Sequence, residues 1–140
     1  MQHREDQLRA AFLSASYGTV TERFRLQATP GRPSPLFGAG RPWAILTAHN
    51  PDAVQHTPLL NERRQRALEA RLQGFPCTPG INGHGRWAEA SLIVSGLPLE
   101  RILSLGREYG QVALLYGVGQ RAALVWCRSG RTERRWVAGG

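Results

Sequence analysis

The sequence predicts one domain over residues 1–140, of the α+β or α/β class, with about three helices packed on a mixed β-sheet of about five to six strands. Three observations lead to this expectation. The chain has 140 residues, of which 41% are hydrophobic and 20% charged, values typical of a globular domain. Helical and strand periodicities alternate through its middle, which favours a β-α-β-α-β arrangement. Three consecutive strand patterns at its end favour a β-meander.

The first third of the chain is expected to form one helix and two strands. Residues 5–16 place apolar side chains at helical spacing, with acidic residues in the first turn, where the helix dipole favours negative charge. Residues 19–27 alternate apolar and polar side chains, which predicts a strand with one wet face. Residues 28–42 are too rich in proline and glycine for regular structure, so we expect a functional or mobile loop. Residues 43–48 predict a strand buried on both faces.

The rest of the chain continues with two helices and four strands. Thr57 can cap a helix that starts at Pro58, because proline's missing donor does no harm in the first turn. That helix should end near Gly74. The remaining elements are expected in this order: a glycine-rich loop over 75–86, a strand over 87–95, a helix over 98–109, and strands over 111–117, 121–127 and 133–137.

Composition narrows the classes of function. The net charge of +8 comes from 18 basic residues, all of them arginine, which draws the protein toward anions even if a GC-rich genome explains the missing lysine. No apolar run is long enough to span a bilayer, and residues 1–12 lack the features of a signal peptide, so we expect a cytoplasmic protein with no membrane partner. Oligomeric state is not indicated.

Cysteine and histidine give no sign of a disulfide framework or a metal site. The two cysteines, Cys77 and Cys127, are far apart and are interpreted as free thiols. Together with Cys77, the histidines at 49, 56 and 84 match no usual zinc spacing. The chain also lacks the motifs of serine hydrolases, P-loops and zinc proteases, so we expect no cofactor, and enzyme activity stays open.

Four segments in order, TAHNP, LLNERR, WAEASLIVSG and GREYGQVALLYG, resemble an uncharacterised bacterial family, the domain of unknown function DUF3293. The resemblance covers roughly residues 40–117. The family often has a larger aromatic residue in place of His49 and a second acidic residue beside Glu89. The resemblance implies no activity, cofactor or catalytic residue.

The main candidate site lies after the strand 43–48. In sheets with parallel strands, ligands bind beyond the carboxyl ends of the strands, and TAHNP occupies such an end. The leading hypothesis is a site for a small anionic, phosphate-containing ligand; a structural turn built around the asparagine before Pro51 is the alternative. The candidate ligand-binding residues are Thr47, Asn50, Asn61, Arg64 and Gln111.

Glu89 is the candidate catalytic residue, because it interrupts an otherwise apolar strand and a buried carboxylate is costly unless it is paired. We expect an arginine partner, with Arg64 and Arg71 as candidates. The enzymatic hypothesis is a hydrolase or transferase with Glu89 as general base and Asn50 or Gln111 orienting the substrate. It requires these side chains to converge, which parallel neighbouring strands would prevent and antiparallel ones would allow.

The third hypothesis is a nucleic-acid contact formed by the basic hairpin at 119–138. Arginine beside tryptophan can bind single-stranded nucleic acid through phosphates and base stacking. A solvated edge hairpin would carry the same residues. The candidates are Arg128, Arg131, Arg134, Arg135 and Trp136, with Trp126 nearby.

Overall fold

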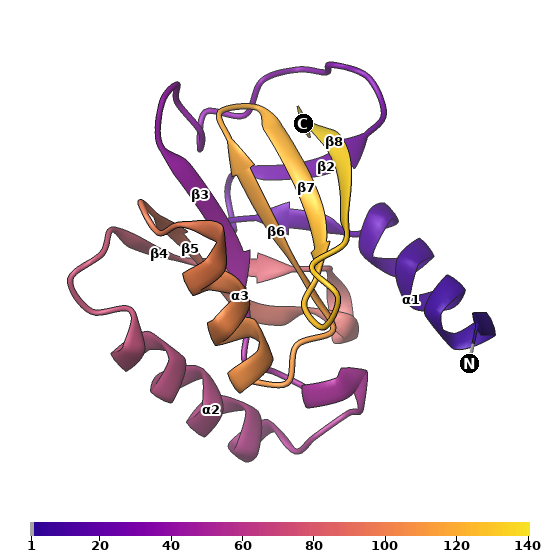
Figure 1. Cartoon of the computed structure of the whole chain (residues 1–140), viewed down its shortest axis with the longest axis vertical. Coiled ribbons are helices and arrows are strands. Elements are labelled where there is room, and N and C mark those ends of the chain that lie inside the picture. Colours follow the sequence, from indigo (N-terminus) through magenta and orange to yellow (C-terminus); the bar gives the residue numbers. More distant parts are fainter. Residues whose placement is uncertain (1) are drawn as a thin grey trace.

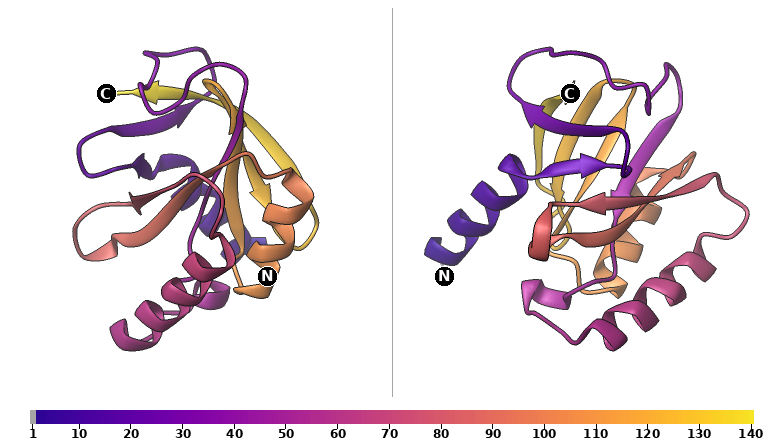
Figure 2. Two further views of the ribbon diagram at one scale, coloured as in Figure 1. Left: turned by 90° about the vertical axis from the view of Figure 1, so that its left-hand side faces the viewer. Right: turned by 180° about the vertical axis from the view of Figure 1, so that it is seen from behind.

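The computed structural model describes residues 2–140 and places eight strands in one antiparallel sheet, which curls into a nearly closed barrel (Figure 1, Figure 2). Every neighbouring pair of strands in this sheet is antiparallel. In sheet order the strands are β1 (Ser16–Gly18), β2 (Arg23–Gln27), β8 (Thr132–Gly139), β7 (Arg121–Trp126), β6 (Ala113–Val118), β3 (Pro42–Leu46), β5 (Glu89–Ser95) and β4 (Cys77–Asn82).

The predicted fold class, a mixed sheet of about five to six strands, is therefore wrong. Two strands were missed, β1 within the region between the first helix and the predicted strand 19–27, and β4 within the predicted loop 75–86. The expected β-α-β-α-β arrangement fails because the helix after β3 leads into β4, which forms an antiparallel hairpin with β5. Since β3 then pairs antiparallel with both β5 and β6, no parallel crossover is formed in the described chain.

Strands β1 and β4, at the two ends of the sheet order, approach each other and nearly close the barrel. The backbone N–H of Gly83, just after β4, donates to Ser16 O over 2.7 Å. Arg23 spans the same gap from β2, donating to Ile81 O at 2.6 Å and Gly83 O at 2.8 Å. Because the guanidinium carries several donors in one plane, a single arginine supplies the bonds that this seam lacks.

Loop 28–41 covers one end of the barrel and forms no helix or strand, as predicted. Phe37 is buried and stacks on Trp43 of β3 with ring centroids 3.9 Å apart. The Gln120 side chain holds the loop by accepting from Ser34 N and donating to Phe37 O. These contacts fix the loop to the barrel. The loop that was predicted to be functional or mobile therefore has a structural role at that end of the barrel.

Three α-helices complete the described fold: α1 (Gln2–Ser14), α2 (Pro58–Arg71) and α3 (Leu99–Glu108). Figure 1 shows α1 on one side of the barrel and α2 and α3 on the other. Strand alternation sends one set of apolar side chains into the barrel and the other outward against α2 and α3. Leu92 and Val94 of β5 thus pack in the outer cluster, while Ile93 lies in the inner one.

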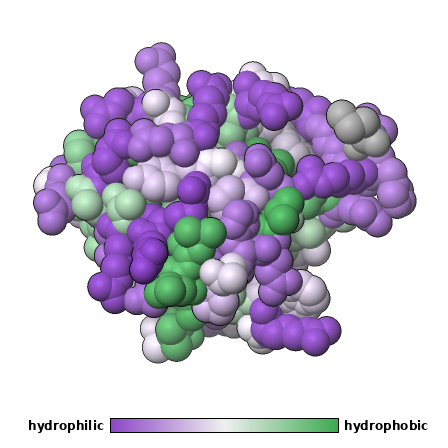
Figure 3. Space-filling view, turned by 90° about the horizontal axis from the view of Figure 1, so that it is seen from below, coloured by the Kyte–Doolittle hydropathy of each residue, from purple (hydrophilic) through white to green (hydrophobic). Residues whose placement is uncertain are grey.

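Helix α2 faces the sheet with polar as well as apolar side chains. It buries Asn61, Gln65 and Leu68, and Gln65 Oε1 accepts from the backbone N–H of Ala48 over 2.8 Å. Near its start, Leu59 is 59% exposed. Seen from below, the molecule presents a mostly hydrophilic surface interrupted by a small hydrophobic patch (Figure 3).

Candidate functional site

A cavity of about 380 Å³ lies at the barrel end opposite loop 28–41, where α1 covers the strand ends. This volume falls in the range of small-molecule sites. Its wall is mostly apolar, with contributions from Phe12 of α1 and from Ile45, Leu115 and Leu124 in the barrel. The polar side chains that line it include Thr47, Asn82, His84, Glu89 and Gln111.

Glu89 is the acidic group of this cavity. As the first residue of β5, two positions before Ser91 and four before Ile93, it points to the interior face of the barrel. Asn50 Nδ2 donates to Glu89 Oε1 over 2.8 Å. Burial raises the pKa of Glu89, and the hydrogen bond from Asn50 opposes this shift. The carboxyl group therefore binds a proton more readily than an exposed glutamate does.

The expected arginine partner of Glu89 is a wrong prediction. Arg64 donates from Nε to Ala48 O over 3.2 Å, and Arg71 pairs with Glu108 on α3. Both arginines thus serve the outer, helix-covered side of the sheet, whereas Glu89 faces inward. Within the described chain, Glu89 has no ion-pair partner and accepts its one side-chain hydrogen bond from an amide.

The asparagines of the predicted anion site bond to each other. Asn50 has a left-handed backbone, with φ 47° and ψ 63°. Its backbone N–H donates to Asn61 Oδ1, and Asn61 Nδ2 donates back to Asn50 Oδ1, each over 2.9 Å. Asn50 Oδ1 also accepts from His56 N over 2.9 Å. These bonds build the turn that links β3 to α2, so an anion would have to displace them, and anion binding here stays a prediction.

Thr47 and Gln111, two further predicted ligand-binding residues, do line the cavity but are tied to backbone groups. Thr47 Oγ1 donates to Ala90 O over 2.7 Å. Gln111 Nε2 donates to His49 O at 3.0 Å and to Tyr109 O at 3.2 Å. Both side chains therefore fix the rim of the cavity, while the antiparallel pairing of β3 and β5 brings this rim next to Glu89.

Three cavity residues, Tyr17, Asn82 and Trp87, were not predicted from the sequence. The Tyr17 hydroxyl donates to Phe12 O, and burial, followed by the nearby charge of Glu89, raises its pKa. Asn82 lies directly opposite Glu89 in the β4–β5 register, and its buried Oδ1 has no partner in the described chain. The Asn82–Gly83 dipeptide indicates a turn, but a two-residue hairpin there would pair residue 81 with residue 84, so the sequence did not place Asn82 opposite Glu89.

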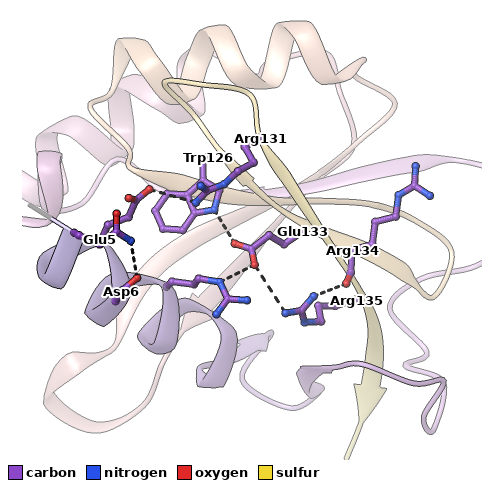
Figure 4. A network of polar contacts seen from close by, with 9 residues as sticks. Glu5, Asp6, Trp126, Arg131, Glu133, Arg134 and Arg135 are labelled. Atoms are coloured by element: carbon purple, nitrogen blue, oxygen red, sulfur yellow. Dashed lines mark hydrogen bonds and ion pairs between the residues drawn. The ribbon is translucent and has the colours of Figure 1, made fainter.

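The basic hairpin does not offer both predicted tryptophans to a nucleic acid. Trp126 is 5% exposed and lies inside the barrel. Arg131 covers its ring, with Cζ 5.1 Å from the centroid, and pairs with Glu5 of α1 (Figure 4). These two residues therefore join the hairpin to α1.

The arginines of β8 are divided between the two faces of the strand. Arg135 lies on the side of Glu133, with Arg135 Nη2 3.9 Å from Glu133 Oε1, whereas Arg134 points away from this pair (Figure 4). Trp136 shares the face of Arg134 by alternation and carries the Arg121 guanidinium 5.0 Å above its ring. Arg128 is exposed in the hairpin turn. The basic surface is thus divided between the two faces of β8, and nucleic-acid binding stays a prediction.

Within residues 2–140, no group of three or more histidine, cysteine or acidic side chains is arranged to hold a metal ion. Cys77 is exposed and Cys127 buried, and both are free thiols. None of the helices in this part of the chain has the length and apolar character needed to cross a membrane.

Comparison with known proteins gave one match. Residues 46–114 match the model of a family described as "Protein of unknown function (DUF3293)", which confirms the resemblance seen in the sequence. The matched segment contains Glu89, Asn50 and Gln111, but not α1 or the arginine-rich hairpin. Neither the curated proteins nor the solved structures gave a match.

Proposed function

We propose a function from the site alone, because residues 46–114 match a family whose description gives no activity: the protein binds a small organic molecule in the cavity under α1, and Glu89 contacts the polar end of that molecule. The observation that carries this proposal is the Glu89 carboxyl group, which opens on a mostly apolar cavity and has no cationic partner in the described chain.

An unpaired carboxyl group at this position is unfavourable for folding. Removing a charge from water costs free energy that an ion pair or several hydrogen bonds would offset, and Glu89 has one bond from Asn50. Folding alone would favour an apolar side chain at the start of β5, such as Ile93 further along the same face. A group that lowers stability inside a cavity is better explained by a ligand that completes its contacts.

The same carboxyl group supports acid–base chemistry on the bound molecule. Burial raises the pKa of Glu89 above its ordinary value, which favours its use as a general acid or base. Asn50 orients the carboxyl group and Gln111 lines the same cavity, and both contacts support the hydrolase or transferase hypothesis. We therefore assign proton donation or acceptance to Glu89 within the proposed site.

A fragment screen read out by thermal shift and by amide chemical shifts tests the proposal. We expect fragments that raise the melting temperature and shift the signals of residues lining the cavity, since a ligand at 100 times its Kd adds about 2.7 kcal/mol of stability. Ala113→Leu should abolish these effects, because Ala113 lines the cavity and the larger side chain fills it.

Matched variants separate a role of Glu89 from a general effect on the fold. Glu89→Gln should weaken binding by about tenfold, because hydrogen bonds to a charged group contribute more than those to a neutral one. Glu100→Gln makes the same change at an exposed position on α3 and should leave binding unchanged. Hits that bind Ala113→Leu as well as the wild type, or an absence of hits at millimolar concentration, would overturn the proposal.

A further inference from the structure

Resting on the proposed function, we infer that the ligand of this cavity is a small organic cation: a protonated amine on an apolar or aromatic body. Three properties of the cavity lead to this class of ligand, namely the sign of its charge, the acceptors it leaves unpaired, and the aromatic rings in its wall.

The cavity is lined by an acidic side chain, whereas the chain as a whole is basic. The protein carries 18 arginines and a net charge of +8, yet none of these arginines lines the cavity. Glu89 is its acidic residue, and His84, at the exposed rim, and the Tyr17 phenol are the other titratable groups. A site for phosphate or carboxylate would be expected to present arginine, whose planar fork matches those anions. The local charge instead favours a cation.

Glu89 and Asn82 place two oxygen acceptors side by side in the wall of the cavity. Asn82 and Glu89 are register partners on β4 and β5, which places their Cβ atoms about 5 Å apart on the interior face. The Asn82 Oδ1 atom is buried and accepts no hydrogen bond within the described chain. Glu89 Oε1 accepts from Asn50, and the carboxylate has further lone pairs to offer. A group with several N–H donors satisfies both residues at once, and an ammonium has three.

Ser91 extends this row of polar groups into the barrel. It lies two residues after Glu89 on the same face, is 2% exposed, and its Oγ has no hydrogen-bond partner in the described chain. Gly80 is its register partner on β4 and brings no side chain. Ser91 is not among the residues that line the cavity, so the unpaired acceptor of Asn82 and the Glu89 carboxyl group supply the polar contacts for one end of a ligand.

Aromatic rings complete the setting for a cation. Phe12, Tyr17 and Trp87 reach the cavity from α1, β1 and the turn between β4 and β5. The negative face of an aromatic ring attracts an ammonium, most strongly for tryptophan. Trp87 is 72% exposed at the rim and already has the Arg86 guanidinium 5.3 Å from its ring centroid. Carboxylate and rings together are the combination used to recognise organic cations.

Three probes of one shape and different charge test the inference: benzylamine, benzyl alcohol and benzoate, titrated into the full chain and followed by amide chemical shifts. We expect benzylamine to bind at least about tenfold more tightly than benzyl alcohol, and benzoate not to bind. Glu89→Gln should weaken benzylamine by about tenfold while changing benzyl alcohol by less than about twofold. Asn82→Asp adds a second acid and should tighten benzylamine.

The outcomes separate this inference from the proposed function. Benzoate or benzyl alcohol binding as tightly as benzylamine would overturn the cationic ligand and leave a small-molecule site standing. The cationic ligand is also overturned, and the small-molecule site retained, if none of the three probes binds but the wider screen yields neutral or acidic fragments that do not bind Ala113→Leu. A screen with no fragment in the cavity overturns both. If Glu89→Gln does not fold, the response to Asn82→Asp decides, and an unchanged or weaker affinity for benzylamine counts against the inference.

Discussion

Asn50 and Glu89 are 39 positions apart in the chain, yet Asn50 Nδ2 donates to Glu89 Oε1 over 2.8 Å. They meet because β3 and β5 run antiparallel, so that the end of one strand lies beside the start of the other. Asn50 is itself held by Asn61 and by the His56 N–H. The turn after β3 thus fixes the position of the acidic group in the cavity.

Asn50→Asp tests this relationship with little other change. The aspartate keeps an oxygen for Asn61 Nδ2 and for His56 N, but it replaces the donor facing Glu89 by an acceptor. Two facing carboxylates repel, so we expect the variant to lose about 2 kcal/mol of unfolding free energy at pH 7. The loss should shrink at about pH 4, where one acid is protonated and donates to the other.

Urea denaturation of wild type and Asn50→Asp at both pH values measures this difference. Gln73→Glu is the matched control, because it also adds one negative charge, at an exposed position just after α2. A loss that is equal at both pH values, or equal in the control, would argue against a carboxylate pair at the cavity.

Glu89 should make the wild type less stable as the pH rises. Its pKa is higher in the folded than in the unfolded chain because of burial, so the folded state binds its proton more tightly. Stability therefore falls as pH increases from the unfolded pKa, about 4.3, through the folded pKa. Glu89→Gln removes this dependence, and its stability relative to wild type should be most favourable at the high end of that window. Melting temperatures from pH 4 to 8 check the sign; a relative stability of Glu89→Gln that declines with rising pH would contradict it.

Much of the fold could be predicted from local patterns, but closure of the barrel could not. The helices and the strands β5 to β8 lie close to their predicted ranges, because the Thr57 cap and Pro58 mark the start of α2 and apolar periodicity is strong in α3. Strand β4 contains Pro79 and Gly80, which indicate a loop in sequence but are tolerated at the edge of a sheet. Strand β1 has three residues, too few for a pattern.

The candidate site could be predicted only in part, because local patterns do not show which segments meet when the barrel closes. Glu89 stood out because a carboxylate in an apolar strand is unusual wherever that strand packs. Tyr17, Asn82 and Phe12 carry no such signal, because their segments become neighbours of Glu89 only when β1, β4 and α1 close the end of the barrel. Strand direction, which the sequence left open for these two strands, decided the rest, since antiparallel pairing of β3 and β5 brings Asn50 to Glu89.

Gly80→Ala should open the seam between β1 and β4. A Cβ at this position would lie 2.8 Å from Gly18 O and 2.8 Å from Ser91 Oγ, and a backbone atom cannot move away cheaply. We expect a loss of about 2 kcal/mol in unfolding free energy, as for other overpacked sites. Gly38→Ala is the control, since its Cβ would meet nothing within 4 Å, and it should change stability by less than about 0.5 kcal/mol. Equal effects of the two variants in urea would show that the seam is not tightly packed.

The divided arginines of the hairpin should bind nucleic acid weakly. Arg131 is engaged with Glu5 and Trp126, and Arg134 and Arg135 point to opposite faces of β8. We expect fluorescence anisotropy with labelled single-stranded DNA to give a Kd no tighter than about 100 μM at physiological salt. Tighter binding, with a salt slope that falls by about one unit in Arg131→Ala and again in Arg134→Ala, would restore the nucleic-acid hypothesis.

Glu133 should stabilise the docking of α1 with a pH dependence opposite to that of Glu89. It accepts from Trp126 Nε1 over 2.9 Å and from Arg9 Nε over 2.7 Å, and Arg135 lies nearby (Figure 4). Desolvation alone would raise its pKa, but the bonds from Trp126 and Arg9 and the charges of the two arginines outweigh it and lower the pKa. The folded state therefore holds the Glu133 proton less tightly than the unfolded state, and this stabilisation is lost as the pH falls through the folded pKa.

Glu133→Gln should therefore cost about 1 kcal/mol at pH 7, a value reduced from that of a buried pair because the Arg9 side chain is 46% exposed, and almost nothing in strong acid. Hydrogen exchange of α1 amides should speed up in the same variant, since the ion pair of Glu133 with Arg9 links β8 to that helix. Glu62→Gln breaks an ion pair with Arg66 that lies wholly on α2 and should change stability by less than about 0.5 kcal/mol. If exchange in α1 is unchanged while stability falls, Glu133 stabilises the hairpin alone, and α1 is held over the cavity by its apolar contacts.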